Sequence, residues 1–130
     1  MISQYLYIST APDLSRDQVT RILEASALNN AARSVTGLLL YNGRNFLQLL
    51  EGEEDTLSAL MDRIGDDPRH SGVSMIDRMT VDERACPDWA MKRIAINQNV
   101  DQRRAELDEQ LPGGLSPEHR RIIMNFAVLN

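Results

Sequence analysis

Hydrophobic and polar positions alternate at the start of the chain and then change to a helical spacing. Residues 2–9 have a period of two, which predicts a strand with two different faces. Tyr5 and Tyr7 share one face, and Leu6 lies on the other. A helix is predicted next, because Ser15-Arg16-Asp17-Gln18 fits a capping box. Its expected apolar positions are Val19, Ile22, Leu23 and Leu28. The helix is expected to end near Asn29-Asn30.

Two apolar runs at residues 35–41 and 46–52 are predicted to form a β-hairpin. They are joined at Asn42-Gly43, a dipeptide that tolerates the positive φ angles of a tight turn. Gln48 lies within the second run, on the face shared by Phe46 and Leu50. A polar side chain there is unfavourable unless it has partners. Gln48 is therefore either bonded to backbone or water near a strand edge, or it binds a ligand.

The rest of the chain supplies a second helix and two more strands. Acidic residues at 53–55 favour a helix N-terminus. The apolar stripe of that helix is Leu57, Leu60, Met61 and Ile64. Residues 73–81 and 89–96 are predicted strands. The order predicts an α+β, ferredoxin-like β-α-β-β-α-β fold with a fifth strand, a mixed sheet and both helices on one face.

The C-terminal tail is predicted to cover the second face of the sheet. Leu38-Leu39-Leu40 is apolar without alternation, which indicates a strand buried on both faces. A polar helix over 100–110 is followed by a break at Pro112-Gly113-Gly114, and Ser116-Pro117 begins another helix. We therefore expect a domain over residues 1–96 and a helical extension over 97–130 that packs on it.

Composition narrows the functional classes. The chain has 130 residues, 42% of them hydrophobic, and a net charge of −5, so one domain without a broad nucleic-acid-binding surface is expected. No apolar run is long enough to span a bilayer, and no secretion signal is evident, which predicts no membrane partner and a cytoplasmic location. Cys86 is the only cysteine and agrees with a reducing compartment.

Ordinary catalytic or metal-binding machinery is not evident. His70 and His119 are far apart in sequence and fit no metal-ligand spacing, so no metal is predicted. Cys86 has no neighbouring base to activate it. The carboxylates of Glu51 and residues 53–55 are expected in loop and helix-cap positions. The chain is therefore predicted not to be an enzyme.

Four polar residues are more informative, because the predicted fold brings their elements together. They are Tyr7, Asn29, Asn30 and Gln48. One phenol and three amides suit the edge of a flat heterocycle with carbonyl and imide groups, and Ile22 and Ile64 could pack on its two faces. The alternative is a capping pair of asparagines and two unrelated polar side chains, and the residues alone leave both open.

The sequence resembles the BLUF family of blue-light sensors that use FAD, over roughly residues 1–96. The segments that carry the resemblance are Tyr7-Ile8-Ser9, Asn29-Asn30, Thr36-Gly37-Leu38-Leu39, Phe46 to Gly52, Asp67-Pro68-Arg69-His70 and Trp89-Ala90-Met91. Each is weakly specific alone, but their order and spacing are highly specific. The resemblance implies FAD held non-covalently between the two helices.

The resemblance also implies a role for each site residue. Tyr7 would be the photochemical electron and proton donor, and Gln48 would bridge its hydroxyl to the flavin. The remaining cofactor-binding residues would be Ile22, Asn29, Asn30, Arg63, Ile64, Asp67, Arg69 and His70. Trp89 and Met91 would relay the signal. Two positions depart from the family pattern, Ala85-Cys86-Pro87 and Ala90, and both fall in this relay segment.

The implied function is a blue-light photoreceptor that signals through a downstream protein or through its own homo-oligomer, a homodimer being the simplest case. No output-domain signature follows residue 96. Two other classes remain as alternatives: a flavin-free adaptor or dimerisation domain on the same scaffold, and a small hydrolase.

Overall fold

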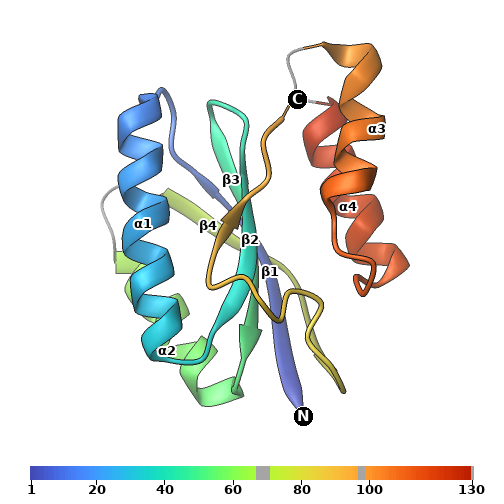
Figure 1. Ribbon diagram of the computed structural model, residues 1–130. Helices are drawn as coiled ribbons and strands as arrows, with labels where there is room; N and C mark the ends of the chain where they lie inside the picture. The colour runs from blue at the N-terminus through green and yellow to red at the C-terminus, as the bar shows by residue number, and fades with distance from the viewer. Residues whose placement is uncertain (67–70, 97–98, 130) are drawn as a thin grey trace.

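The computed structural model describes residues 1–66, 71–96 and 99–129 (Figure 1). Along the chain the elements are β1 (Ile2–Thr10), α1 (Arg16–Ala32), β2 (Thr36–Tyr41), β3 (Asn45–Gly52), α2 (Glu54–Asp66), β4 (Ser71–Val81), β5 (Lys92–Arg93), α3 (Val100–Gln110) and α4 (Pro117–Leu129). The predicted order of strands and helices is confirmed. The segment Asp66-Asp67-Pro68-Arg69, whose proline predicts the end of the second helix, falls largely outside the described residues.

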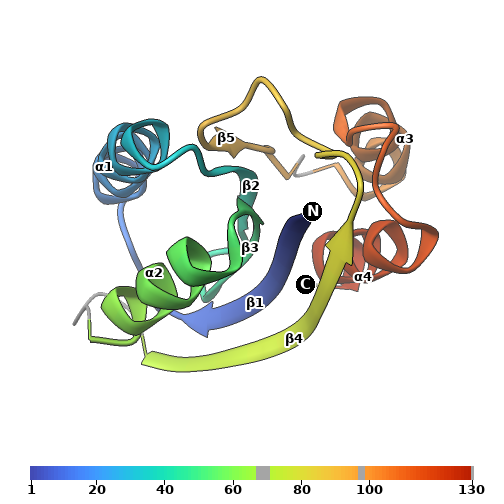
Figure 2. The ribbon, with the colours of Figure 1, turned by 90° about the horizontal axis from the view of Figure 1, so that it is seen from below.

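The strands form one mixed sheet in the order β4-β1-β3-β2-β5. Each neighbouring pair among the first four strands is antiparallel, and β5 runs parallel to β2. Figure 2 shows α1 and α2 on one side of this sheet and α3 and α4 on the other. The predicted ferredoxin-like architecture with C-terminal helices on the second face is therefore confirmed.

Each face of the sheet has its own hydrophobic core, because side chains on a strand alternate between faces. The core beneath α1 and α2 contains Tyr7 and Leu39. The core beneath α3 and α4 contains Leu6, Leu38 and Leu40. All five of these side chains have no exposed surface. Leu38-Leu39-Leu40 is thus buried on both faces, as its unbroken apolar pattern predicted.

The capping box at the start of α1 forms as predicted. The Ser15 hydroxyl accepts from the Gln18 N–H at 3.1 Å, and the Gln18 Oε1 accepts from the Ser15 N–H at 2.7 Å. The helix continues to Ala32, two residues past its expected end. Leu28 was wrongly placed in the apolar stripe: it is 76% exposed, because it lies on the helix face opposite buried Ile22 and Asn30.

The β2–β3 hairpin is confirmed, but its turn is centred one residue later than predicted. The Asn42 N–H donates to the Asn45 carbonyl, so Gly43-Arg44 occupies the centre, with Gly43 at φ 93°. The side-chain oxygen of Asn42 accepts from the N–H groups of Arg44 and Asn45 at 2.9 and 2.8 Å. Asn42 therefore caps the turn instead of adopting a positive φ itself.

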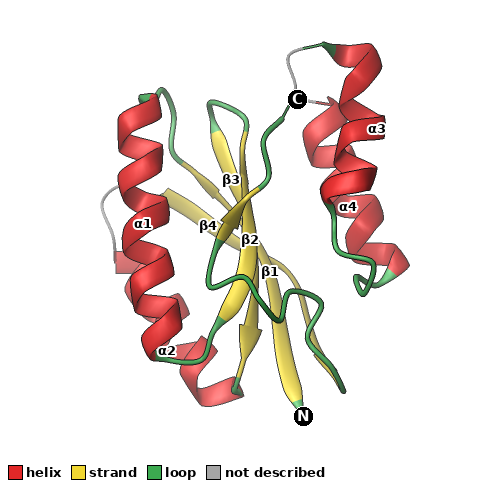
Figure 3. Cartoon of the chain, viewed as in Figure 1, coloured by secondary structure: helices red, strands yellow, loops and turns green. Residues whose placement is uncertain are grey.

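The fifth strand is much shorter than the predicted 89–96 and contains only Lys92 and Arg93 (Figure 3). On the N-terminal side of β5 the segment makes a competing long-range contact, because the carbonyl of Ala90 accepts a hydrogen bond from the Asn30 side chain at 2.7 Å. The Trp89 carbonyl still accepts from the Gly37 N–H at 2.8 Å, so this segment remains attached to the sheet edge.

Candidate functional site

Tyr7 and Gln48 form the centre of the candidate site. They are direct partners in the antiparallel β1–β3 ladder, and both point toward α1 and α2. The Tyr7 hydroxyl donates to the Gln48 Oε1 at 2.5 Å. Tyr7 is fully buried, and burial raises the pKa of its phenol above the ordinary value of 10.0. The phenol therefore stays protonated at neutral pH and acts as a hydrogen-bond donor.

A pocket lies above this pair, between α1 and α2, and we call it the α1–α2 pocket. Six predicted cofactor-binding residues line it: Ile22, Asn29, Asn30, Gln48, Arg63 and Ile64. Its volume is about 170 Å³. Tyr7 is not among the lining residues and contacts the pocket through Gln48. The structure thus brings together the polar set that the sequence singled out.

The amides in this pocket have unused hydrogen-bonding capacity. Because the Gln48 oxygen accepts from Tyr7, the Gln48 NH₂ group faces the pocket, and it has no partner among the described residues. The Asn30 NH₂ group donates to the Ala90 carbonyl, which leaves its side-chain oxygen available in the same part of the structure. Asn29 is exposed but also lines the pocket. Together these amides present both donors and acceptors to an incoming ligand.

The predicted residues around the mouth of the pocket are only partly described. Arg63 is exposed and Ile64 is half-buried, both in the last turns of α2. A guanidinium at the rim of a pocket is well suited to a phosphate or carboxylate group. Asp67, Arg69 and His70 lie outside the described residues.

Met91 and Trp89 occupy different sides of the sheet edge. Met91 is buried and lines the α1–α2 pocket. Trp89 is half-buried and packs against the core beneath α3 and α4, with the Lys92 ammonium 4.4 Å from its ring centroid. The segment that carries both therefore connects the pocket with the opposite core, and Met91 is the residue on the pocket side.

Glu51 has a role that the sequence analysis did not anticipate. It was expected in a loop or helix cap, but it lies within β3 and is fully buried on the α3–α4 side. Its carboxylate accepts four hydrogen bonds, from the side chains of Gln4 and Thr36 and from the backbone N–H groups of Ala85 and Cys86, at 2.6–3.1 Å. Strand alternation with Leu47 and Leu49 was the signal that could have identified its burial.

The Glu51 contacts fix the relay segment to the sheet. Ala85 and Cys86 begin the chain that leads to Trp89 and Met91, and Arg84 adds bonds to the Ser34 and Glu51 carbonyls at 2.7 and 3.0 Å. Burial, with a further contribution from the Glu51 carboxylate, raises the pKa of the Cys86 thiol to about 12. The segment is thus held by Glu51 at its start and by Asn30 near Ala90.

No group of His, Cys, Asp or Glu side chains within residues 1–66, 71–96 and 99–129 could hold a metal ion. The helices in the described part of the chain are also too short or too polar to cross a bilayer. Four more residues line the α1–α2 pocket without having been predicted. They are Ala25, Ser26, Leu50 and Leu60.

Comparison with known proteins shows which family this chain resembles. The family model described as "BLUF: Sensors of blue-light using FAD" matches residues 2–92. The beta subunit of the photoactivated adenylate cyclase of Euglena longa is 36% identical over 88 residues, which is 67% of this chain and 10% of that protein. The blue light- and temperature-regulated antirepressor BluF of Escherichia coli is 36% identical over 56 residues, 43% of this chain and 14% of that protein. This chain therefore spans about a tenth of the length of the curated relatives it matches.

Solved structures agree in fold over nearly the whole chain. BlrB, a BLUF protein in its dark state, superposes with a TM-score of 0.70 at 29% identity and covers 93% of this chain and 83% of its own. Klebsiella pneumoniae BlrP1 with FMN and cyclic diGMP gives a TM-score of 0.84 at 25% identity, covering 98% of this chain and 34% of its own.

Proposed function

The chain belongs to the BLUF family of blue-light sensors, and we propose that it is a photoreceptor that holds FAD non-covalently in the α1–α2 pocket. The family is one of flavin-binding sensory domains rather than enzymes. The observation that carries the proposal is the 2.5 Å hydrogen bond between Tyr7 and Gln48 at the base of a pocket lined by amides.

The lining residues fit a flavin in chemistry. The carbonyl and imide edge of an isoalloxazine ring requires both donors and acceptors, which Gln48, Asn30 and Asn29 supply. Ile22 and Ile64 offer apolar surfaces from opposite helices for the two faces of the ring. Arg63, at the rim, would meet the phosphates of the dinucleotide tail. From the family resemblance alone, we place Asp67, Arg69 and His70 near the flavin edge or its ribityl and phosphate tail.

The size of the pocket indicates how a ring would enter. A cavity of ~150 Å³ holds a single benzene ring. The 170 Å³ of the α1–α2 pocket is therefore sufficient for one edge of a tricyclic ring system, inserted toward Gln48 and Asn30. The rest of the ring and the tail would lie toward the open side, where Arg63 is exposed.

Tyr7 and Gln48 supply the photochemical roles in this proposal. The bound flavin contributes the absorption of blue light and a one-electron acceptor. Tyr7 gives up an electron, and its phenolic proton leaves along the hydrogen bond to Gln48. Gln48 then changes its hydrogen-bond arrangement by rotation or tautomerisation. The electron and proton return to Tyr7, so the lasting change is in the bonds of Gln48 and involves no net oxidation.

The signal would leave through the segment that contains Met91 and Trp89. A changed hydrogen bond is worth only about 1 kcal/mol, so the element that responds must be close to balance between two packings. Met91 lines the pocket, and the Asn30–Ala90 hydrogen bond connects it to the same segment. Trp89 then contacts the core beneath α3 and α4, and a downstream protein or a second copy of the chain would read the change there.

Absorption spectroscopy of the purified protein tests this proposal. We expect a flavin band that moves to longer wavelength under blue light and returns in darkness, and release of the cofactor by heat should identify FAD rather than FMN. A colourless protein, or a flavin band that does not respond to light, would contradict it. A colourless protein that only associates would favour an adaptor domain, and one that turns over substrate would favour a hydrolase.

A further inference from the structure

A second pocket, at the opposite end of α1, shares no lining residue with the α1–α2 pocket. It has a volume of about 500 Å³ and lies between the start of α1, the β2–β3 turn, the segment after β5 and the first turns of α3. Arg16, Arg93, Arg103 and Asn42 are its polar lining residues, and we call it the arginine pocket.

The charge of the arginine pocket differs from that of the chain. Three of its ten lining residues are arginines and none is acidic, although the chain has 14 basic and 19 acidic residues in total. Arg103 donates to the carbonyl of Ala127 at 3.2 Å, which ties α3 to the end of α4. The ion pairs of the described residues include neither Arg16 nor Arg93.

Two buried donors in this pocket have no partner among the described residues: the Nε of Arg93 and the Nδ2 of Asn42. The amide of Asn42 cannot rotate to hide its nitrogen, because its oxygen already caps the turn through Arg44 and Asn45. An unpaired buried guanidinium N–H is unfavourable, and a ligand with acceptor atoms would satisfy these donors. A negatively charged acceptor would also match the arginines of the pocket.

The remaining lining residues indicate an organic ligand. Leu14, Val19 and Ile96 give the pocket an apolar wall. A volume of this size falls within the ~300–1,000 Å³ of typical small-molecule sites and exceeds the needs of a bare inorganic ion. Guanidinium groups bind phosphate and carboxylate in a planar, paired geometry. We propose that the arginine pocket binds a small organic molecule through an oxyanion held by Arg93 and Asn42, with a phosphate monoester favoured by the three arginines.

Titration calorimetry on the purified 130-residue chain, kept in darkness with any bound flavin retained, tests this inference. Phenyl phosphate, benzoate and inorganic phosphate serve as probes at constant ionic strength. We expect saturable binding of phenyl phosphate. Benzoate should bind more weakly because its carboxylate carries less negative charge than a phosphate monoester, and inorganic phosphate should bind more weakly because it lacks an apolar body. Equal binding of phenyl phosphate and benzoate would still support an oxyanion site but would overturn the preference for phosphate. Absence of saturable binding by all three probes would overturn the proposal.

Substitutions place the binding at this pocket. Arg93→Gln should weaken binding by at least about tenfold, since a charge-assisted hydrogen bond is lost. Asn42→Asp keeps the turn-capping oxygen and replaces the unpartnered donor with a carboxylate oxygen in the pocket that Arg93 lines. It should abolish probe binding and raise the melting temperature of the ligand-free protein, because the missing acceptor is then built in.

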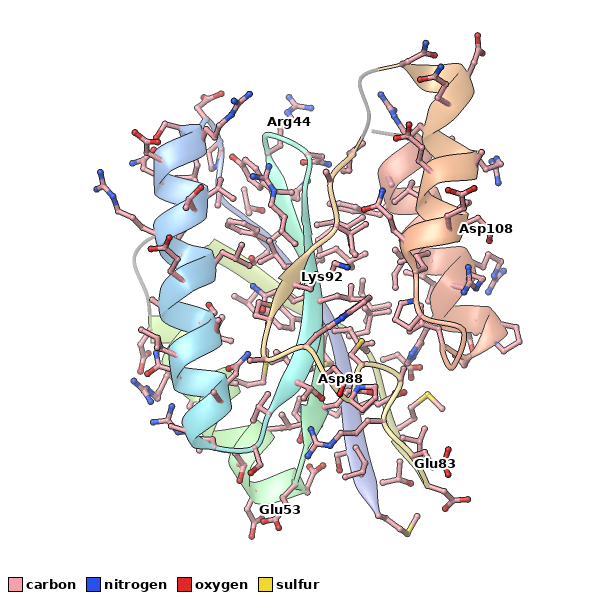
Figure 4. The ribbon with its side chains drawn as sticks, in the orientation of Figure 1. Arg44, Glu53, Glu83, Asp88, Lys92 and Asp108 are labelled. Atoms are coloured by element: carbon pink, nitrogen blue, oxygen red, sulfur yellow. The ribbon has the colours of Figure 1, made fainter. Side chains whose placement is uncertain are left out.

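Arg44→Gln is the matched control. Arg44 lies at the tip of the same hairpin and outside the pocket lining (Figure 4), so its loss should change the affinity less than about twofold. Equal losses in Arg44→Gln and Arg93→Gln would show a diffuse charge effect and overturn the proposal. Flavin absorption should be unchanged in all three variants, and the result does not depend on the photoreceptor assignment.

Discussion

Tyr7 and Gln48 face each other across two neighbouring strands, with the phenol hydroxyl 2.5 Å from the amide oxygen. The backbone register of β1 and β3 sets this distance, because the two residues are Cα partners in the ladder. Leu39 flanks Gln48 on the other side, in β2. A donor and an acceptor fixed by a central pair of strands need little reorganisation when a ligand binds above them.

Replacing Tyr7 with Phe should remove the light response but keep the flavin. The phenol contacts the pocket only through Gln48, so the cofactor should bind, while the electron and proton donor is lost. We expect a normal dark flavin band and no red shift under blue light, measured by difference absorption. The control is Tyr5→Phe. This variant also removes a buried hydroxyl on the same strand face, but one that donates to Glu54 and not to Gln48. A normal shift in Tyr7→Phe would contradict the donor assignment.

Substitutions at Met91 and Trp89 should have separable effects. Met91→Ala removes a side chain that lines the pocket, so the flavin band and its dark recovery should both change. A change of about 1 kcal/mol in the recovery barrier would alter the rate roughly fivefold. Trp89→Ala should leave the dark flavin band unchanged, because its ring packs on the opposite core. The dark absorption spectra and the recovery rates of both variants test these expectations. A changed dark band in Trp89→Ala with an unchanged band in Met91→Ala would show that Trp89 is the residue near the flavin.

The Glu51 carboxylate should contribute strongly to stability. All of its lone-pair positions face donors, two of which are backbone N–H groups that cannot turn away. Glu51→Gln places an NH₂ group against one of these donors in either amide orientation. We expect a loss of about 2–3 kcal/mol in the free energy of unfolding, measured with urea. Glu53→Gln, at an exposed position two residues later, should change it by less than about 0.5 kcal/mol, and similar losses in both variants would contradict the argument.

Much of the fold could be predicted from the sequence, because its signals are local. The capping box at Ser15, the period of two in β1 and the apolar run at Leu38–Leu40 each depend on neighbouring residues. The polar set of the site was also predictable, since Tyr7 and Gln48 stood out as polar side chains on buried strand faces. Their individual roles came from the family resemblance.

The features that could not be predicted depend on contacts between distant segments. The late start of β5 accompanies the hydrogen bond from Asn30 to the Ala90 carbonyl, 60 residues away in sequence. The sequence alone does not show that Glu51 is buried and hydrogen-bonded, because its backbone donors lie 34 and 35 residues away. The arginine pocket likewise draws Arg16, Arg93 and Arg103 from separate elements, so no sequence motif marks it.

Cys86 should be unreactive in the folded protein. The side chain is 2% exposed and the pKa of its thiol is raised to about 12, so almost no thiolate is present at pH 8. We expect iodoacetamide to label Cys86 only under unfolding conditions, as measured by mass spectrometry. In the unfolded chain the thiol ionises near its ordinary value of 9.0. The free energy of unfolding should therefore fall as pH rises from about 9 to about 12, because only the unfolded state releases the proton in that range.

The Cys86→Ala variant separates the contribution of the Cys86 thiol to this pH dependence from the contributions of other groups. Burial also raises the pKa of Tyr7, which adds to the same decline above its ordinary value of 10.0. Cys86→Ala should retain the Tyr7 part and show a shallower loss of stability with pH. Rapid labelling of the native wild-type protein at pH 8 would show that the segment opens without global unfolding, contrary to the expectation.

His119 and Asp77 should hold α4 on the sheet. An irregularity in β4 pairs Met75 with Tyr7 but Asp77 with Leu6, so the intervening Ile76 is an extra residue in the ladder. Without it, Met75 and Asp77 would point to the same face. With it, Met75 packs in the core beneath α1 and α2, while Asp77 lies 2.8 Å from the buried Nε2 of His119 near the start of α4.

Asp77→Ala should therefore loosen α4 selectively. It leaves a fully buried imidazole without its partner, which we expect to lower the free energy of unfolding by about 1–3 kcal/mol and to speed amide exchange in α4 more than in β1. The control is Asp108→Ala, which breaks the exposed ion pair between Asp108 of α3 and Arg120 of α4. This substitution should lower the free energy of unfolding by less than about 1 kcal/mol. The flavin band should be unchanged in both variants, because α4 covers the opposite face of the sheet. Equal exchange rates of α4 in the two variants would mean that the apolar core alone, without the His119–Asp77 contact, fixes the helix.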